Sequence, residues 1–297
     1  MANRQRDWRA ITASLAFGLG VMSSAAAAME RVCFETSDNA RLCYLERRLD
    51  DPAKPLLVFI PGWTMPATIW QRQLTHFAGR YPLVAFDPRG QGQSPAHPSG
   101  YTLERRVADI KELLERFPDR RVVLVAWSLA VLETLAYVAE HGEQRLAGLV
   151  LVDNSIGEGP DGPASTGPNP FFRELREQRE ATMRRFAAAI FRTPVDSGIL
   201  DDVVTSTLQL PVEDSIRLLS YSRPRAFWRT AVHASKLPIL YLVTPKWREQ
   251  ARMLTDQCPN ARAVVFNKAG HALFWDQATA FNAALDDFLG IRAGSGN

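Results

Sequence analysis

The sequence predicts an α/β fold in which a mostly parallel sheet is flanked by helices. Short, nearly continuous apolar runs of strand length alternate along the chain with longer segments of helical periodicity, a pattern typical of buried parallel strands joined by helices. Several of these runs end in glycine-containing turns. A chain of 297 residues with 46% hydrophobic composition can also bury the core that one such domain needs.

The N-terminal residues 1–28 are predicted to be a secretory signal peptide. Three arginines precede an apolar stretch at 10–22, and a run of serine and alanine at 23–28 offers small residues for cleavage. The alternative is an uncleaved membrane anchor, but the apolar stretch is short for a membrane span and contains Gly, Ser and Thr. We therefore expect a periplasmic or secreted protein without a membrane anchor.

The charge of the chain does not favour a nucleic-acid partner. The full chain carries a net charge of +3, and removal of residues 1–28 takes away three arginines and Asp7, which leaves a net charge near +1. Residues 171–185 alternate arginine with glutamate, as on a solvated helix face rather than a binding patch. No nucleic-acid partner is expected.

Two cysteines lie on short predicted strands on either side of a polar turn at 37–39. Cys33 and Cys43 are placed almost symmetrically about this turn, which makes them cross-strand neighbours in a hairpin. In an oxidising compartment they are expected to form a disulfide; the alternative is two reduced, buried thiols. Cys258 has no predicted partner, and no Cys-X-X-Cys or His-X-X-X-His spacing indicates a metal site, so neither a metal nor a cofactor is expected.

The most informative segment is the apolar strand at 121–126, which is followed by Ser128 and then by a helical pattern. A hydroxyl on such a sharp turn stands clear of both elements, and the first turn of the helix directs unpaired backbone N–H groups towards the atom that it attacks. The pattern predicts a nucleophile elbow. The alternative is that Ser128 only caps the helix, because serine is a favoured N-cap residue.

A serine nucleophile needs a histidine base and a carboxylate that orients the histidine. His271 follows a short strand in a glycine-containing loop, just before the final helix. The other four histidines lie in helical patterns or in a proline-rich loop. His271 is therefore predicted to be the base.

Two further segments complete a pattern that resembles the α/β-hydrolase family. A buried strand that begins at residue 55 ends in the turn Pro61-Gly62-Trp63, which corresponds to the oxyanion turn His-Gly-X of that family. A second buried strand at 83–86 is followed by an Asp-X-X-Gly-X-Gly loop at 87–92. The resemblance covers residues from about 31 to 290.

This resemblance implies that the backbone N–H groups of Trp63 and Leu129 form the oxyanion hole. Since only backbone groups are required, proline in place of histidine at position 61 removes no donor. The elbow itself has Ala126 and Ala130 where the family usually has the glycines of Gly-X-Ser-X-Gly. Each alanine adds one methyl group where strand and helix approach closely.

The resemblance leaves two positions for the acid. The family usually carries it after the strand that here spans 238–243, but the next segment offers no carboxylate before Glu249. A minority arrangement places the acid after the sixth strand, which is 148–152 here and is followed directly by Asp153. We predict that Asp153 orients His271, with Glu249 as the alternative acid.

An insertion is predicted after Asp153, because about 80 residues separate it from the next strand and a crossover helix needs far fewer. In the resembled family such an insertion is a cap that excludes water and shapes the substrate pocket. We therefore expect an α/β-hydrolase core at 29–154 and 236–297 and a helical cap at 155–235.

Together these features predict a serine hydrolase that cleaves a carboxylic ester, thioester or lactone through an acyl-enzyme on Ser128. The aromatic side chains of Trp63 and Trp127 flank the predicted reaction centre and favour a small-molecule substrate with an apolar acyl or alcohol group. Dehalogenases and epoxide hydrolases of the resembled family use an aspartate nucleophile, so the serine argues against both. The alternatives are a cofactor-free haloperoxidase or perhydrolase, an acyltransferase, and, from another class, a non-catalytic ligand-binding protein on a hydrolase fold.

Overall fold

The computed structural model describes residues 29–160 and 169–293. The expected signal peptide at 1–28 lies outside these residues. The described part contains one eight-stranded sheet. Its strands are β1 (Glu30–Glu35), β2 (Arg41–Arg47), β3 (Leu56–Ile60), β4 (Leu83–Asp87), β5 (Val122–Trp127), β6 (Leu146–Val152), β7 (Ile239–Val243) and β8 (Ala261–Val265).

The strand order is β1-β2-β4-β3-β5-β6-β7-β8. β2 runs antiparallel to both of its neighbours, and the six strands from β4 to β8 in this order are parallel to one another, which confirms the predicted mostly parallel sheet. From β3 the chain goes to β4 on one side and later to β5 on the other. In open α/β sheets the ligand crevice forms at such a reversal, at the carboxyl ends of the strands.

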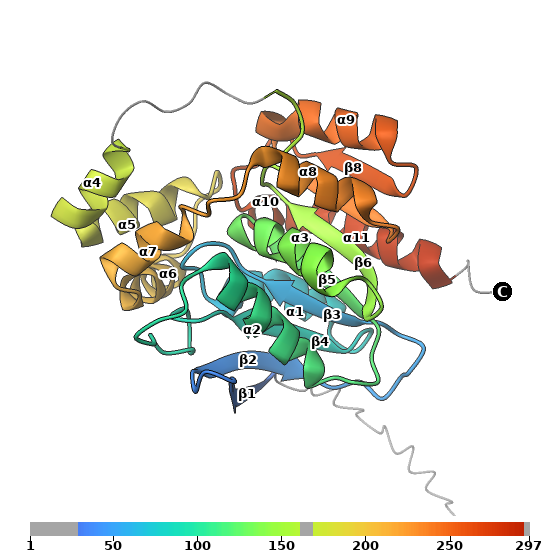
Figure 1. Cartoon of the computed structure of the whole chain (residues 1–297), viewed down its shortest axis with the longest axis horizontal. Helices are drawn as coiled ribbons and strands as arrows, with labels where there is room; N and C mark the ends of the chain where they lie inside the picture. Colours follow the sequence, from blue (N-terminus) through green and yellow to red (C-terminus); the bar gives the residue numbers. More distant parts are fainter. Residues whose placement is uncertain (1–28, 161–168, 294–297) are drawn as a thin grey trace, which may run out of the picture.

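Helices cover both faces of the sheet (Figure 1). One apolar core lies between the sheet and helices α2, α3, α8 and α9, and the other lies between the sheet and helices α1, α10 and α11. The helices of the two layers are α1 (Gln71–Phe77), α2 (Leu103–Glu115), α3 (Leu129–His141), α8 (Arg225–Ala234), α9 (Arg248–Gln257), α10 (Leu273–Asp276) and α11 (Ala278–Ala293), with short 3₁₀ helices η1 (Ala67–Trp70) and η2 (Pro245–Trp247).

Four more helices form a separate group between β6 and β7. They are α4 (Pro170–Glu177), α5 (Arg179–Ala189), α6 (Ser197–Gln209) and α7 (Val212–Leu218), and they lie together at one side of the sheet in Figure 1. Their apolar side chains pack on Trp63 and Leu129, which follow β3 and β5. The sequence places α8 in the cap at 155–235, but in the structure this helix packs beside α3. Its Trp228, Ala231 and Val232 are buried in the core that the sheet forms with α2, α3 and α9.

None of the helices in the described ranges is both long enough and apolar enough to cross a bilayer.

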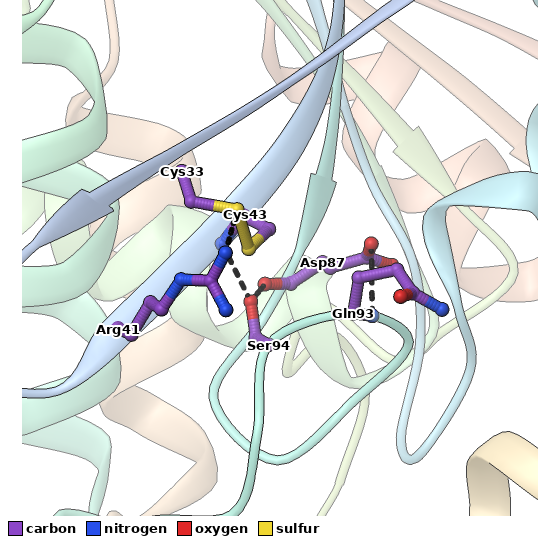
Figure 2. Close-up of a disulfide and its surroundings, with 6 residues drawn as sticks. All are labelled: Cys33, Arg41, Cys43, Asp87, Gln93 and Ser94. Atoms are coloured by element: carbon purple, nitrogen blue, oxygen red, sulfur yellow. Dashed lines mark hydrogen bonds between the residues drawn. A yellow bond between two sulfur atoms is a disulfide. The ribbon is translucent and has the colours of Figure 1, made fainter.

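The N-terminal hairpin contains the predicted disulfide. Cys33 and Cys43 are direct partners in the β1–β2 register, and their sulfur atoms are bonded. Figure 2 shows the bridge beside the loop that follows β4: the backbone N–H of Cys43 donates to Ser94 Oγ (2.8 Å), and that hydroxyl donates to the carbonyl of Asp87 (2.5 Å). The hairpin is therefore tied both to itself and to the 87–94 loop.

Removing the disulfide is expected to destabilise the fold. A cross-link that closes a loop of this size reduces the entropy of the unfolded chain, which corresponds to about 2–3 kcal/mol in the free energy of unfolding. We expect the double variant Cys33→Ser/Cys43→Ser to unfold at a lower urea concentration by a corresponding amount. Reduction of the wild type should give the same loss and leave the variant unchanged. Equal urea midpoints for oxidised wild type and variant would contradict the prediction.

Candidate active site

Ser128 lies in a strained turn between β5 and α3. Its φ and ψ angles are 56° and −122°, a region that residues other than glycine rarely adopt. The turn is held by its backbone, because the N–H of Ser128 donates to the carbonyl of Val152 (2.8 Å) and its own carbonyl accepts from Asn154 Nδ2 (2.8 Å). The side chain makes no capping hydrogen bond to α3, so a helix-capping role does not account for the hydroxyl.

The two alanines that flank the elbow fit without opening it. Ala126 and Ala130 are both fully buried, and their methyl groups pack in the core beneath α3. The close approach that does require glycine is at Gly62. A Cβ atom on Gly62 would lie 2.8 Å from Cβ and 3.4 Å from Oγ of Ser128, so the backbone after β3 comes directly against the serine.

Three predicted residues meet at the carboxyl ends of the strands. His271 Nε2 lies 2.8 Å from Ser128 Oγ, and His271 Nδ1 lies 2.7 Å from Asp153 Oδ2. Asp153 is buried, whereas the imidazole is about one-third exposed. This is the nucleophile–base–carboxylate geometry of a Ser-His-Asp triad.

Glu249, the alternative acid, is not near this chain of contacts. It lies in the first turn of α9, its side chain is 74% exposed, and its carboxylate pairs with Arg252 Nε at 3.1 Å. The geometry therefore favours Asp153 as the partner of the histidine.

Thr244 is a site residue that the sequence did not indicate. It follows β7, at the position where the sequence lacks the expected carboxylate. Its backbone N–H and its hydroxyl both donate to Asp153 Oδ1, at 2.7 Å and 2.8 Å. Because Oδ1 is occupied by these two donors, Oδ2 of Asp153 is left to face the histidine. Asp153 also has a positive φ of 47°, in the left-handed region that aspartate tolerates better than most residues.

The two backbone N–H groups predicted for an oxyanion hole belong to residues next to Ser128, one in sequence and one in space. Leu129 begins α3, so its N–H is one of the free donors at the helix start. Trp63 follows Gly62, whose backbone contacts the serine. Neither N–H has an acceptor among the residues that the structure describes.

The two tryptophans differ from the prediction that both line a pocket. Trp127 is buried against Trp70 and Phe274, and its Nε1 donates to the carbonyl of His271 (2.9 Å). The buried indole of Trp127 therefore supports the loop that carries His271. The indole of Trp63 packs in the cap, where Nε1 donates to the carbonyl of Ser215 in α7 (2.7 Å).

A cavity of about 230 Å³ opens beside Ser128 between α3, α7 and α8. Its wall combines apolar and polar surface without a charged side chain, and it is lined by Ser128, Leu129, Leu132, Asn154, Leu218, Leu219, Tyr221 and Trp228. The polar end of Tyr221 is already engaged, because its hydroxyl donates to Glu133 Oε1 (2.8 Å). Burial, together with the Glu133 charge, raises the pKa of Tyr221 well above 10, so the phenol stays neutral.

Asp87 is a buried carboxylate that fixes the turn after β3. Its Oδ1 accepts from the backbone N–H of Ala67 (2.6 Å) and its Oδ2 from that of Gln93 (3.1 Å). Burial raises the pKa of Asp87 from its ordinary value of 3.8 to about 6, although these two N–H groups act in the opposite direction.

This pKa predicts a pH-dependent contribution to stability. Between pH values of about 4 and 6 the folded protein holds a proton on Asp87 that the unfolded chain has lost, so stability falls as the pH rises through this window. Relative to Asp87→Asn, which cannot titrate, the wild type should gain about 1 kcal/mol in the free energy of unfolding between pH 7 and pH 5. Urea unfolding of both proteins at the two pH values measures this gain. A difference that does not change with pH would show that Asp87 is ionised throughout.

Within residues 29–160 and 169–293, no group of three or more His, Cys, Asp or Glu side chains is arranged to hold a metal ion.

Comparisons with known proteins agree with this fold. A family model described as "Alpha/beta hydrolase family" matches residues 57–284. The chain is 25% identical over 247 residues to pimeloyl-[acyl-carrier protein] methyl ester esterase of Vibrio parahaemolyticus, which covers 79% of this chain and 94% of that protein. It is 36% identical over 88 residues to epoxide hydrolase 4 of Mus musculus, but that match spans only 26% of this chain and 24% of the relative.

Among solved structures, an esterase from Exiguobacterium antarcticum superimposes with a TM-score of 0.74 at 18% sequence identity, covering 87% of this chain and 99% of the esterase. At this identity the similarity shows the fold alone.

Proposed function

Because the chain belongs to the α/β-hydrolase family, we propose that it is a serine hydrolase that cleaves a small carboxylic ester, thioester or lactone. The observation that carries this proposal is the continuous set of contacts from Asp153 through His271 to Ser128, at 2.7 Å and 2.8 Å. A helix-capping serine or a purely structural histidine would not need all three groups in this order.

In the proposed reaction His271 takes the proton of Ser128 as the oxygen attacks the substrate carbonyl. Asp153 holds the imidazole with its N–H on Nδ1, so that Nε2 is free to accept that proton and stabilised once it is charged. The histidine then returns the proton to the leaving group. In the second half of the reaction it takes a proton from the water that attacks the acyl-enzyme and gives a proton back to the departing Ser128 oxygen. Negative charge on the carbonyl oxygen is stabilised by the N–H groups of Trp63 and Leu129.

The cavity beside Ser128 supports an apolar, uncharged group on the substrate. Four leucines, Tyr221 and Trp228 line it beside the polar Ser128 and Asn154, and no charged side chain does. Asn154 already uses its NH₂ on the carbonyl of Ser128. At about 230 Å³ it is smaller than the roughly 300–1,000 Å³ of drug-sized ligand pockets. We expect short or medium aliphatic acyl groups, or a single aromatic ring, to be accepted better than long chains.

The proposal also includes export, with removal of residues 1–28 and a periplasmic or secreted mature protein. The disulfide between Cys33 and Cys43 supports this location, because such bonds persist in oxidising compartments. Intact-mass measurement of the protein recovered after expression with its own N-terminus tests it. A mature chain that still contains residues 1–28 would contradict cleavage.

The experiment that tests the catalytic proposal is labelling with a fluorophosphonate, followed by intact-mass analysis and mapping of the modified peptide. This reagent requires a nucleophile, a base and an oxyanion hole together. The expected result is one adduct, on Ser128, that is absent from Ser128→Ala. No adduct under conditions that label a known esterase would favour the non-catalytic binding protein instead.

Once labelling succeeds, turnover of p-nitrophenyl esters with added acceptors separates the remaining reaction types. The proposed hydrolase releases free acid at a rate that hydrogen peroxide or an alcohol does not raise. Formation of peracid would identify a perhydrolase, and formation of a new ester would identify an acyltransferase.

A further inference from the structure

A buried side chain of the 87–92 loop holds the turn that follows β3. Gln91 is fully buried, and its Nε2 donates to the carbonyl of Gly62 (3.0 Å) and to the carbonyl of Met65 (2.8 Å). The backbone N–H of Met65 also donates to the Gly62 carbonyl (3.2 Å). One side-chain amide therefore holds two carbonyls of the same turn.

The Gly62 carbonyl belongs to the same peptide unit as the N–H of Trp63. A trans peptide is planar and its C=O and N–H point in opposite directions, so the orientation of one determines the orientation of the other. The backbone of Gly62 also lies against Ser128. A group that holds the Gly62 carbonyl on the buried side of the turn consequently holds the Trp63 N–H on the side of the serine.

We propose that Gln91 is a positioning residue for the oxyanion hole: its amide fixes the Gly62–Trp63 peptide and thereby aims the Trp63 N–H at the reacting carbonyl oxygen. This inference rests on the proposed serine-hydrolase function. It gives a role to a residue of the Asp-X-X-Gly-X-Gly loop that does not contact the triad itself.

The Gln91 side chain makes its hydrogen bonds through the NH₂ group and not through the amide oxygen, which supports a role for the NH₂ group. Its Oε1 is buried without a hydrogen-bond partner in the described structure. An apolar side chain of similar length would fill the space without leaving a buried oxygen unpaired. The amide is thus favourable at this position through its two donor contacts, both of which are made to the turn.

The loop is shaped so that the residue at position 91 reaches the turn. Gly90 and Gly92 have φ angles of 71° and 55°, on either side of the glutamine. A Cβ atom on Gly92 would lie 1.9 Å from Oδ1 of Asp87, so the loop must pass tightly over this carboxylate. Asp87 holds Ala67, at the far end of the same turn.

The test compares Gln91→Leu with a matched control, Gln73→Leu. Gln73 is also fully buried, also donates through Nε2, to the carbonyl of Phe274 and to Asn282, and also has an unpartnered Oε1. It makes these contacts near α10 and α11 rather than at the turn. The control therefore reproduces the chemical change and the loss of packing contacts without touching the Gly62 carbonyl.

For hydrolysis of p-nitrophenyl butyrate, Gln91→Leu is expected to lower kcat about 10- to 100-fold and to leave KM within about threefold. The reason is that a misaligned N–H weakens binding of the transition state more than binding of the ester. Gln73→Leu should keep kcat within about threefold of wild type, even if its melting temperature falls as much as that of Gln91→Leu. The rate of fluorophosphonate labelling should follow kcat in both variants.

A second variant keeps the proposal testable if Gln91→Leu does not fold. In Gln91→Glu an ionised carboxylate would face two carbonyl oxygens, whereas the protonated acid can donate to one of them. The ratio of variant kcat to wild-type kcat should therefore rise as the pH falls from about 8 to about 5. A purely structural role for position 91 predicts no such rise at temperatures where both proteins are folded.

The proposal is overturned if kcat of Gln91→Leu stays within about threefold of wild type, if Gln73→Leu loses as much, or if the Gln91→Glu ratio does not change with pH. Failure of the proposed function has a different signature, because the wild type itself would then neither label on Ser128 nor hydrolyse the ester.

Discussion

Replacing Ser128 by alanine is expected to lower kcat for p-nitrophenyl ester hydrolysis by about 10⁴-fold or more. The variant loses the atom that forms the proposed acyl-enzyme, and neither His271 nor the backbone donors can supply a nucleophile of the same reactivity. What remains should be only the acceleration that substrate binding and the oxyanion hole provide. The measurement is the initial rate with purified, folded protein at saturating ester.

The effect should be specific to that hydroxyl. Ser155 is close in sequence to Asp153, but its hydroxyl contacts Gln250 rather than the histidine (3.1 Å). Ser155→Ala should therefore retain kcat within about threefold. The melting temperature of Ser128→Ala should not fall steeply, because alanine keeps the Cβ atom and the lost hydroxyl contacts the partly exposed His271. A Ser128→Ala protein with more than about 1% of wild-type kcat would exclude the proposed nucleophile.

The second large effect is expected for Asp153→Asn, which should lower kcat by about 10³- to 10⁴-fold. The two Thr244 donors, which now face Oδ1, will hold the amide oxygen of the asparagine. Its NH₂ group then faces His271 Nδ1 and favours the tautomer with the proton on Nε2. That tautomer cannot accept the proton of Ser128. The measurement is kcat across the pH range in which the wild type is active.

Glu249→Gln is the matched comparison, because it makes the same chemical change at the other acid that the sequence offers. Its carboxylate is mostly exposed and pairs with Arg252, so kcat should stay within about twofold of wild type. Full activity in Asp153→Asn together with a large loss in Glu249→Gln would reverse the assignment of the acid.

The residues that could be predicted are those whose roles depend on local sequence. Ser128 lies between a strand and a helix that are each visible as apolar patterns, and His271 stands in a short loop after a strand. Asp153 could be predicted from the order of strands once the resemblance had been recognised. In each case the side chain stands in the segment that follows a strand, and such segments meet at the carboxyl edge of a parallel sheet, wherever the strand lies in the order.

Thr244 and Gln91 could not be predicted in the same way, because their contacts depend on three-dimensional register. Thr244 reaches Asp153 across 91 residues of sequence, and Gln91 reaches Gly62 across 29 residues. A threonine and a glutamine in these loops carry no pattern of their own. The role of Trp127 was not predicted for a related reason. Side chains alternate between the two faces along β5, and this alternation places the Trp127 indole in the core that contains Trp70 and Phe274.

The assignment of α8 to the core rather than to the helical insertion also required the structure. Both segments have helical periodicity, and the sequence groups them in one insertion. Only the contacts separate them: Ile216 and Leu218 of α7 pack on Trp63, whereas Trp228 and Val232 of α8 pack with the sheet core.

The hydrogen bond from the Trp63 indole to Ser215 has a consequence for protein engineering. Residue 63 carries the main-chain N–H proposed for the oxyanion hole, and its side chain contacts α7, so one residue connects the proposed reaction centre with the helical insertion. Ser206 of α6 adds a second link by donating to the carbonyl of Thr64 (3.3 Å). A chimaera that carries the helical insertion of another family member would need a hydrogen-bond acceptor for the Trp63 indole and a donor for the Thr64 carbonyl. Otherwise the transplanted helices would change turnover even for substrates that never touch them.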